Sequence, residues 1–384
     1  MDSFKKISLL VVLLFLSTYS CFAQTEHKID SIIKANRLTI YKNPEETARI
    51  GDSIYSSPQS SNYDKVRGLL LLSSAYSSKR DYQKALKYCL KSDSIAKKEN
   101  NQDINANIAN SIAIVYQQLK VYDKALEYID KCEGILGKYK IRDSVYLRAT
   151  NFAVRGLIYK EGFSCELAIP FLDKSISYYK RLNTKNEQPN LSIMYYNKGY
   201  CYYTMGKYKE AKTSFEEAVL YAEFINAKSL KAFALKGLAE VYTHEENYSE
   251  AIKVLEEALT LSKDVGDLIL NRGVYMALAD NYLSVNNWEK YQEYRKLFLR
   301  NQDIIKESER RSISDSIDGL MVEYDTKTSQ LKNRYYIYLS VIIILILIAL
   351  FVIYRYHNKA KKSLNKLRLE LQKVKKSRKL TNLS

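Results

Sequence analysis

Glycine and proline are scarce in this sequence of 384 residues, which contains 12 Gly and 4 Pro. Together they make up about 4% of the chain, against a usual share of roughly 12%, so few positions interrupt regular structure. Histidine is nearly as rare, with three residues, and the five cysteines are scattered. These counts argue against a histidine-based metal site or catalytic triad. No glycine-rich phosphate loop, paired-histidine motif or nucleophile elbow is present. We therefore expect a helical, non-enzymatic chain without cofactor or metal.

The first 23 residues have the features of a secretory signal peptide. Lys5 and Lys6 form a basic start, residues 7–16 are apolar, and residues 21–23 form a cleavage site with small outer residues. The apolar stretch is too short to cross a bilayer. Lipid attachment at Cys21 is the less favoured alternative to ordinary cleavage. We predict that the rest of the chain is exported.

A second apolar stretch, residues 336–354, contains no charge, glycine or proline. As a helix that rises 1.5 Å per residue, it would extend about 28 Å, the thickness of a hydrocarbon core. The following tail, residues 355–384, carries eleven Lys or Arg against one acid. By the positive-inside rule, we predict a single-pass inner-membrane protein with a periplasmic N-terminal part and a cytoplasmic tail. Because most of the net charge of +17 lies in this tail, it does not indicate nucleic-acid binding.

One pattern recurs along residues 64–295. A small residue is followed by a tyrosine, a second aromatic residue, an alanine and further small residues, and successive tyrosines are 40 or 43 residues apart. The positions that carry the pattern are Tyr76, Ala85, Tyr116, Ala125, Gly156, Tyr159, Ala168, Gly199, Tyr202, Ala211, Ala218, Tyr242, Ala251, Ala258 and Tyr282. The pattern resembles the tetratricopeptide repeat (TPR), which has small residues at positions 8, 20 and 27 and a tyrosine at position 11. The usual repeat has about 34 residues, so the helices or loops here are longer.

The resemblance implies an all-α fold, a right-handed superhelix of about six helix pairs. A single amphipathic pair cannot bury its apolar face, whereas stacked pairs share one core. We expect a leading helical half-repeat with Pro44 at a helix start, and a coiled-coil seam in the tail at Ala360, Leu364, Leu367, Leu371 and Val374. The predicted domains are the signal peptide (1–23), a leading helical half-repeat or cap (24–63), the repeats (64–295), a charged helical stalk (296–335), the transmembrane helix (336–354) and the basic tail (355–384).

In this repeat family, the first helices of successive repeats line a concave groove, and positions 2, 5, 9 and 12 of each repeat point into it. The resemblance therefore implies a groove for a peptide or protein partner. The candidate groove residues are Asn107, Asn110, Gln117, Lys160, Tyr196, Tyr200, Tyr203, Lys236, Glu240 and Asp280. Tyrosines beside amides suit contacts with a peptide backbone. The alternative is that tyrosines such as Tyr200 pack between helices.

The four remaining cysteines, Cys89, Cys132, Cys165 and Cys201, fall in four different repeats, where a small apolar side chain would pack. We interpret them as free thiols of the core. A disulfide between adjacent repeats is the alternative, because the repeats are expected to lie outside the cytoplasm.

The whole plan resembles membrane-anchored TPR regulators and sensors of Bacteroidetes-type bacteria, although no helix-turn-helix or kinase domain follows the span. Two hypotheses remain open. In the first, which we favour, periplasmic repeats bind a ligand and the span relays the signal to a cytoplasmic partner. The tail would then form a homodimer or pair with an acidic partner helix. In the second, the chain is a static membrane-anchored scaffold that assembles periplasmic protein complexes.

Overall fold

The computed structural model describes residues 29, 31–33, 35, 36, 39, 40, 43–97, 99, 101–263 and 267–381. The expected signal peptide lies outside these residues. Every regular element in the described ranges is a helix, which confirms the all-α class. The chain divides into two units, Met1–Glu307 and Ser308–Ser384.

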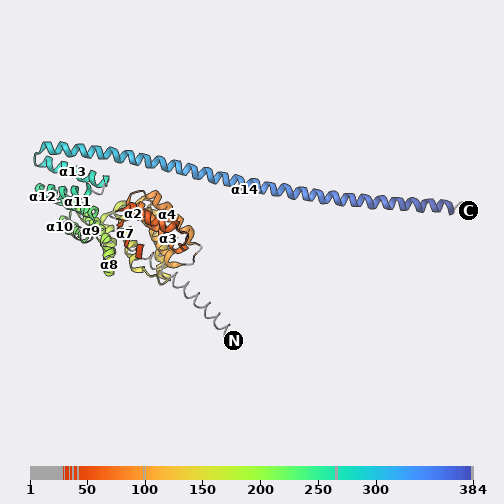
Figure 1. The fold of residues 1–384 in the computed structure, drawn as a ribbon, viewed down its shortest axis with the longest axis horizontal. Coiled ribbons are helices and arrows are strands. Elements are labelled where there is room, and N and C mark those ends of the chain that lie inside the picture. Colours follow the sequence, from red (N-terminus) through yellow and green to blue (C-terminus); the bar gives the residue numbers. More distant parts are fainter. Residues whose placement is uncertain are drawn as a thin grey trace, which may run out of the picture. The chain divides into compact units, whose positions relative to one another are not determined.

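The first unit is a stack of helix pairs (Figure 1). Its elements are α2 (Pro44–Ser56), α3 (Asn62–Ser78), α4 (Tyr82–Ala96), α5 (Gln102–Gln118), α6 (Tyr122–Lys138), α7 (Ser144–Gly162), α8 (Cys165–Leu182), η1 (Lys185–Glu187), α9 (Gln188–Thr204), α10 (Tyr208–Phe224), α11 (Lys228–His244), α12 (Tyr248–Lys263), α13 (Leu268–Ser284) and the first turns of α14 (Trp288–Thr381). Successive helices pack as pairs, and the first helices α3, α5, α7, α9, α11 and α13 also contact one another in chain order. They form one continuous layer.

Small residues allow the two helices of each pair to approach closely. The alanines at position 20 are all fully buried, namely Ala85, Ala125, Ala168, Ala211 and Ala251. On α7, a Cβ atom added at Gly156 would lie 2.8 Å from Cδ2 of Leu172 on α8. Since that distance is shorter than any ordinary contact, only glycine fits there without movement of Leu172.

The turns between the two helices of a pair repeat one hydrogen-bond pattern. The carbonyl group of the repeat tyrosine accepts a hydrogen bond from the backbone N–H five residues later, at 2.8–2.9 Å, for Tyr76, Tyr116, Tyr202, Tyr242 and Tyr282. The residue before that donor has a positive φ of 59° to 73° in each case, at Arg80, Lys120, Gly206, Glu246 and Asn286. This is the Schellman motif, in which a left-handed residue ends the helix. The third pair differs, because α7 continues to Gly162.

Replacing the exposed Lys120 with glycine should stabilise the protein by about 0.5–1 kcal/mol. The left-handed conformation costs a residue with a Cβ atom about 1–2 kcal/mol, and the greater freedom of glycine in the unfolded chain offsets part of that gain. The reciprocal change, Gly206→Ala, should destabilise by about 1 kcal/mol. Urea titrations of the full chain, followed by circular dichroism, would measure the free energy of unfolding of both variants. A lower stability of Lys120→Gly would contradict the left-handed conformation assigned to Lys120.

The predicted helix start at Pro44 is confirmed. Pro44 is the first residue of α2, and the side chain of Asn43 accepts a hydrogen bond from the backbone N–H of Glu46 at 3.1 Å. Helix α2 then packs closely on α3, since a Cβ atom at Gly68 would lie 2.8 Å from the carbonyl oxygen of Gly51. Helix α2 therefore extends the stack before α3.

The second unit consists of the remainder of α14. Within the described residues, one helical stretch, Leu331–Leu371, is long and apolar enough to cross a membrane. It contains the predicted span at residues 336–354, and its apolar side chains are exposed in the single chain. Three residues of the predicted seam, Leu364, Leu367 and Leu371, are exposed there as well. Pairing along this seam stays a prediction.

Candidate functional site

The concave layer of first helices contains a hollow of about 570 Å³, which we call the N-terminal hollow. Many of its lining residues occupy positions 2, 5, 9 or 12 of their repeats, on α3, α5, α7 and the start of α9. They are Arg67, Leu70, Ser74, Ser77, Asn107, Asn110, Ile114, Gln117, Thr150, Ala153, Leu157 and Ile193. Ile33 and Ile40 of the leading segment border it too. Most of the lining consists of apolar, amide or hydroxyl side chains, and the charged side chains are Arg67, Asp103, Arg142, Asp143 and Glu187. An apolar hollow with a limited number of polar groups is typical of a ligand site.

A second hollow of about 490 Å³, the C-terminal hollow, lies over α11 and α13. Its groove positions are Tyr203, Lys236, Glu240, Thr243, Gly273, Met276 and Asp280. The rest of the lining consists of Arg272, Ala277 and Asn281 of α13 and of Phe298 and Gln302 of α14. Charged side chains make up a larger share of this lining than of the N-terminal one, so the two ends of the groove offer different chemistry.

The groove positions between the two hollows hold Lys160, Tyr196, Tyr200 and Phe233, a cluster that we call the partition. The ring of Tyr196 meets those of Tyr200 and Phe233 edge to face, with centroids 4.9 and 5.7 Å apart. Behind them, the fully buried ring of Phe215 lies 5.3 Å from the ring of Tyr200. These contacts hold the two tyrosines rigidly, and their rings are only partly exposed.

A hydrogen-bonded triad connects the partition to the C-terminal hollow. The Lys236 ammonium donates to the phenol oxygen of Tyr200 at 2.6 Å, and that phenol donates to Oε1 of Glu240 at 2.9 Å. Lys236 and Glu240 also form an ion pair. Burial, together with the nearby Tyr196 and Glu240, raises the pKa of Tyr200 well above its usual value. Tyr200 therefore stays a neutral hydrogen-bond donor at physiological pH.

An ion pair joins two distant parts of the stack near the partition. Nη2 of Arg80, in the turn after α3, lies 3.1 Å from Oδ2 of Asp267, although 187 residues separate them. The other carboxylate oxygen of Asp267 caps α13 by accepting from the backbone N–H groups of Ile269 and Leu270. The charges of both Arg80 and Asp267 act on the phenol of Tyr196, whose pKa is raised mainly by burial. The stack therefore curves enough to bring its first turn close to its last pair.

Lys160, at position 12 of the third repeat, lies at the partition. Its ammonium group donates to Oδ1 of Asn197 on α9 at 2.6 Å. No carboxylate among the described residues is within ion-pair distance of it, and burial lowers the pKa of Lys160. The charge of the adjacent Glu161 partly offsets this lowering of the pKa, while its carboxylate accepts hydrogen bonds from Tyr122 at 3.1 Å and from Gln117 at 3.4 Å.

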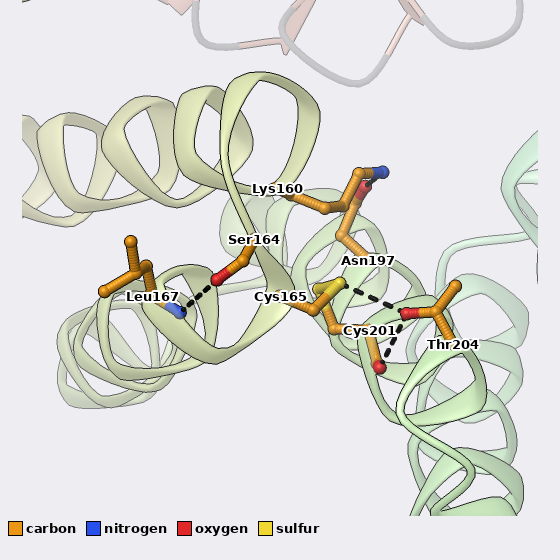
Figure 2. Close-up of a disulfide and its surroundings, with 7 residues drawn as sticks. All are labelled: Lys160, Ser164, Cys165, Leu167, Asn197, Cys201 and Thr204. Carbon is orange, nitrogen blue, oxygen red and sulfur yellow. Dashed lines mark hydrogen bonds between the residues drawn. A yellow bond between two sulfur atoms is a disulfide. The ribbon is translucent and has the colours of Figure 1, made fainter.

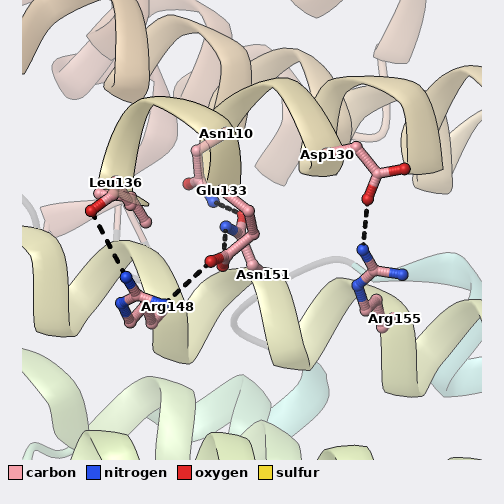
Figure 3. A network of polar contacts seen from close by, with 7 residues as sticks. All are labelled: Asn110, Asp130, Glu133, Leu136, Arg148, Asn151 and Arg155. Atoms are coloured by element: carbon pink, nitrogen blue, oxygen red, sulfur yellow. Dashed lines mark hydrogen bonds and ion pairs between the residues drawn. The ribbon is translucent and has the colours of Figure 1, made fainter. Parts of the chain in front are cut away.

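Asn110, another candidate groove residue, is part of a buried polar network (Figure 3). Its Nδ2 donates to Oδ1 of Asn151 at 2.9 Å, and Nδ2 of Asn151 donates to Glu133 at 2.7 Å. Arg148 pairs with the same carboxylate at 3.1 Å. Asn110 is 3% exposed and Asn151 is 1% exposed. The network links α5, α6 and α7 directly beneath the N-terminal hollow, so the amide of Asn110 supports the groove and is already engaged.

The prediction of four free thiols is wrong for two of them. Cys165 at the start of α8 and Cys201 on α9 form a disulfide, with their Cα atoms 5.0 Å apart (Figure 2). Cys89 and Cys132 are free and buried, as predicted. The helix crossing explains the difference, since it brings Cys165 against the next pair, whereas Cys89 contacts Ser73 and Cys132 contacts the carbonyl group of Ala106. The disulfide therefore joins the third repeat to the fourth, next to the partition.

The structure distributes the candidate groove residues over three places. Asn107, Asn110 and Gln117 line the N-terminal hollow, and Tyr203, Lys236, Glu240 and Asp280 line the C-terminal hollow. Lys160, Tyr196 and Tyr200 lie between them. Ile114, Thr150, Leu157, Ile193 and Met276 also line the hollows. They occupy the same repeat positions as the candidates, but the sequence analysis did not name them. Arg80 and Asp267 carry no local signal, because their contact depends on the curvature of the whole stack.

Comparisons with known proteins agree with this geometry. One model of the tetratricopeptide repeat family matches residues 190–264, and another matches residues 66–99. The chain carries tetratricopeptide repeats. A TPR repeat-containing protein of Methanocaldococcus jannaschii is 32% identical over 190 residues, which are 47% of this chain and 28% of that protein. The chain thus spans less than a third of the length of this relative.

Two solved structures are similar to this chain, and the first of them shows the same helical fold. A Signal Transduction ATPase with Numerous Domains that has a tetratricopeptide repeat sensor, from Pyrococcus horikoshii, is 16% identical with a TM-score of 0.54. The match covers 71% of this chain and 41% of that one. A Rap protein complexed with Competence and Sporulation Factor is also 16% identical, with a TM-score of 0.49 over 67% of this chain and 80% of that one.

The groove offers hydrogen-bonding and apolar side chains. In the part of the chain that the structure describes, no three His, Cys, Asp or Glu side chains come together as a possible metal site. The tyrosine hydroxyls, amides and paired charges can hydrogen-bond, and the apolar positions of the N-terminal hollow can bury side chains. TPR proteins are typically binding scaffolds without enzymatic activity.

Proposed function

We propose that this chain is a membrane-anchored receptor whose TPR groove binds an extended peptide segment and relays that event across the membrane. The observation that carries the proposal is the N-terminal hollow, in which groove positions of three successive repeats line one cavity of about 570 Å³. Such a volume lies within the range of small-ligand sites, roughly 300–1,000 Å³. It therefore suits a few residues of an extended chain better than a folded domain.

The lining favours a peptide over other small ligands. Asn107 and Gln117 bring amide groups to this lining. Their nitrogens donate within the protein, to the carbonyl group of Asp103 at 2.8 Å and to Glu161 at 3.4 Å, so their amide oxygens can accept from the N–H groups of a peptide backbone. Between them, Ile114 and Leu157 offer apolar contacts for alternate side chains. A repeated combination of backbone and side-chain contacts is how extended peptides are generally bound.

A random decapeptide library, displayed with the peptides fused at their C-termini, tests this proposal. The full chain in nanodiscs should enrich a defined family of sequences. The variant Leu157→Asp, which puts a charge into the hollow, should not enrich that family. Leu220→Asp is the matched control, since Leu220 lies on α10 and is 59% exposed. If the wild type enriches no sequence family, or if Leu157→Asp keeps it, the groove is not a peptide site.

The membrane part of the proposal depends on the stretch Leu331–Leu371 and the basic tail. A disulfide persists in oxidising compartments, so Cys165–Cys201 supports placing the repeats in the periplasm. The excess of Lys and Arg after the span supports a cytoplasmic tail. In this arrangement, the tail is the segment that pairs with a second copy or with an acidic cytoplasmic partner, and so carries the output.

Protease added to spheroplasts should digest the repeats and spare a tag fused after Ser384. The reason is that the positive-inside rule places the eleven basic residues of the tail in the cytoplasm. Lysed spheroplasts are the control, in which the tag should be digested as well. Repeats that stay protected in intact spheroplasts would contradict the proposed topology.

A further inference from the structure

The ion pair of Arg80 with Asp267 joins two distant helices of the stack. Arg80 lies in the turn after α3, whose residues line the N-terminal hollow, and Asp267 directly precedes α13. In the packing of the helices, α3 contacts α2, α4 and α5, whereas α13 contacts α11 and α12. The ion pair is therefore a direct link between the first full repeat and the last pair, in addition to the path through the repeats between them. We call this link the strap.

The strap lies beside the groove. The side chain of Asp267 is 15% exposed and that of Arg80 is 40% exposed, and both charges act on the phenol of Tyr196 in the partition. The other oxygen of the Asp267 carboxylate accepts from the backbone N–H groups of Ile269 and Leu270 at 3.0 and 3.1 Å. Because a carboxylate is favourable at a helix N-terminus, these bonds fix it to the first turn of α13. A movement of α13 relative to α3 therefore changes the ion pair.

The same first turn of α13 holds α14. Nδ2 of Asn301 donates to the carbonyl group of Leu268, the residue after Asp267, at 3.3 Å. Tyr294 of α14 is buried in a core cluster together with residues of α13. Helix α14 then continues through the stretch Leu331–Leu371, which is long and apolar enough to cross a membrane. Two adjacent residues, Asp267 and Leu268, therefore connect the end of α3 to the helix that contains the predicted span.

We propose that the strap transmits ligand binding in the N-terminal hollow to α14. This inference rests on the proposed function and names a route from the groove to the membrane-spanning helix. The hollow and the strap are formed in the same arrangement of the repeats, so a ligand that fits this hollow favours the strapped arrangement. By linkage, the strap strengthens binding of the ligand by the same factor. Opening of the strap releases the first turn of α13 from α3 and weakens its hold on Asn301 of α14.

Hydrogen exchange of the full chain in nanodiscs, without a ligand, tests the link itself. In Arg80→Gln, amides at the start of α13 and in residues 288–307 of α14 should exchange about 2- to 5-fold faster, as expected for the loss of one partly exposed ion pair. Lys120→Gln is the matched control, because Lys120 has the same left-handed position in the turn after α5, with a φ of 61° against 63° for Arg80. It should leave α13 and α14 unchanged. Faster exchange of Arg80→Gln that is confined to the turn between α3 and α4 would overturn the inference.

Asp267→Asn provides the reciprocal test. Asparagine is also a good N-cap residue, so this variant keeps the start of α13 and removes the charge. It should speed exchange in the turn that holds Arg80, 187 residues away in sequence. The double variant of Arg80→Gln with Asp267→Asn should exchange no faster than either single variant, because both changes break one interaction. Additive effects would mean that the two residues act independently, which would contradict the strap.

A decapeptide selected from the library then tests the relay. In the wild type, it should raise protection on α3, α5 and α7 and also on residues 288–307 of α14. In Arg80→Gln, the first rise should remain, the rise on α14 should be lost, and the Kd should increase by about 2- to 5-fold. The same rise on α14 in both proteins would overturn the inference and leave the peptide site standing. A library that yields no peptide would overturn the proposed function, and the exchange without ligand would then decide on the strap alone.

Discussion

Replacing Phe215 with alanine should lower the free energy of unfolding by about 3–5 kcal/mol, because it opens a cavity at a fully buried aromatic side chain. Phe215 of α10 projects between the helices α9 and α11. A Cβ atom added at Gly199 or Gly237 would lie 2.7 or 2.3 Å from its Cε1 atom, so both glycines make room for this ring. The rings of Tyr196 and Tyr200 pack against it, so the partition should loosen together with the core.

A urea titration of the full chain measures this change, and Phe224→Ala provides the matched control. Phe224 lies on the same helix and is 65% exposed, so its truncation should change stability by no more than about 0.5 kcal/mol. A double-mutant cycle sharpens the test. Gly237→Ala should destabilise the wild type through its clash with Phe215, and should stabilise Phe215→Ala by about 1 kcal/mol through its helix propensity. An equal loss of unfolding free energy in Phe215→Ala and Phe224→Ala would contradict the packing of Phe215 between α9 and α11.

Removing the disulfide by changing Cys165 and Cys201 to serine should cost about 2–4 kcal/mol. The bond closes a loop across 36 residues of sequence, and the unfolded chain regains that freedom when the bond is lost. It also joins α8 to α9, so the third and fourth repeats should separate more easily. Protection of amide hydrogens in these two helices should fall more than protection in α5 and α6.

Reduction provides the control for this prediction. Dithiothreitol should lower the urea midpoint of the wild type to that of the double serine variant, and it should leave the variant unchanged. Cys89→Ala should keep the sensitivity to reductant, because Cys89 is a free buried thiol. A wild-type midpoint that does not respond to dithiothreitol would mean that the disulfide does not stabilise the stack.

The helix pairs could be predicted because their information is local. The spacing of Tyr116, Tyr159 and Tyr202 marks the end of each first helix, and a buried alanine nine residues later marks the second. Likewise, Asn43 and Pro44 together specify the start of α2. Each of these signals depends on a few adjacent residues whose backbone preferences do not change with the rest of the fold.

Features that depend on contact between repeats were harder to predict. Periodicity placed Cys165 and Cys201 on buried faces, but their pairing follows from the crossing of α8 and α9. The repeat position of Tyr196 predicts that it lies in the groove. Its burial, however, results from Phe215 and Phe233, which come from two other helices. The ion pair of Arg80 with Asp267 depends on the sum of many small rotations between repeats, which one sequence does not specify.

Hydrogen exchange of the full chain in nanodiscs, with and without a selected peptide, tests the central claim most directly. If the concave groove binds the peptide, protection should rise on the first helices α3, α5 and α7, whose residues line the N-terminal hollow. The second helices α4 and α6 should change little, since none of their residues lines that hollow. Protection that rises on α4 and α6, or on none of the repeats, would contradict the account.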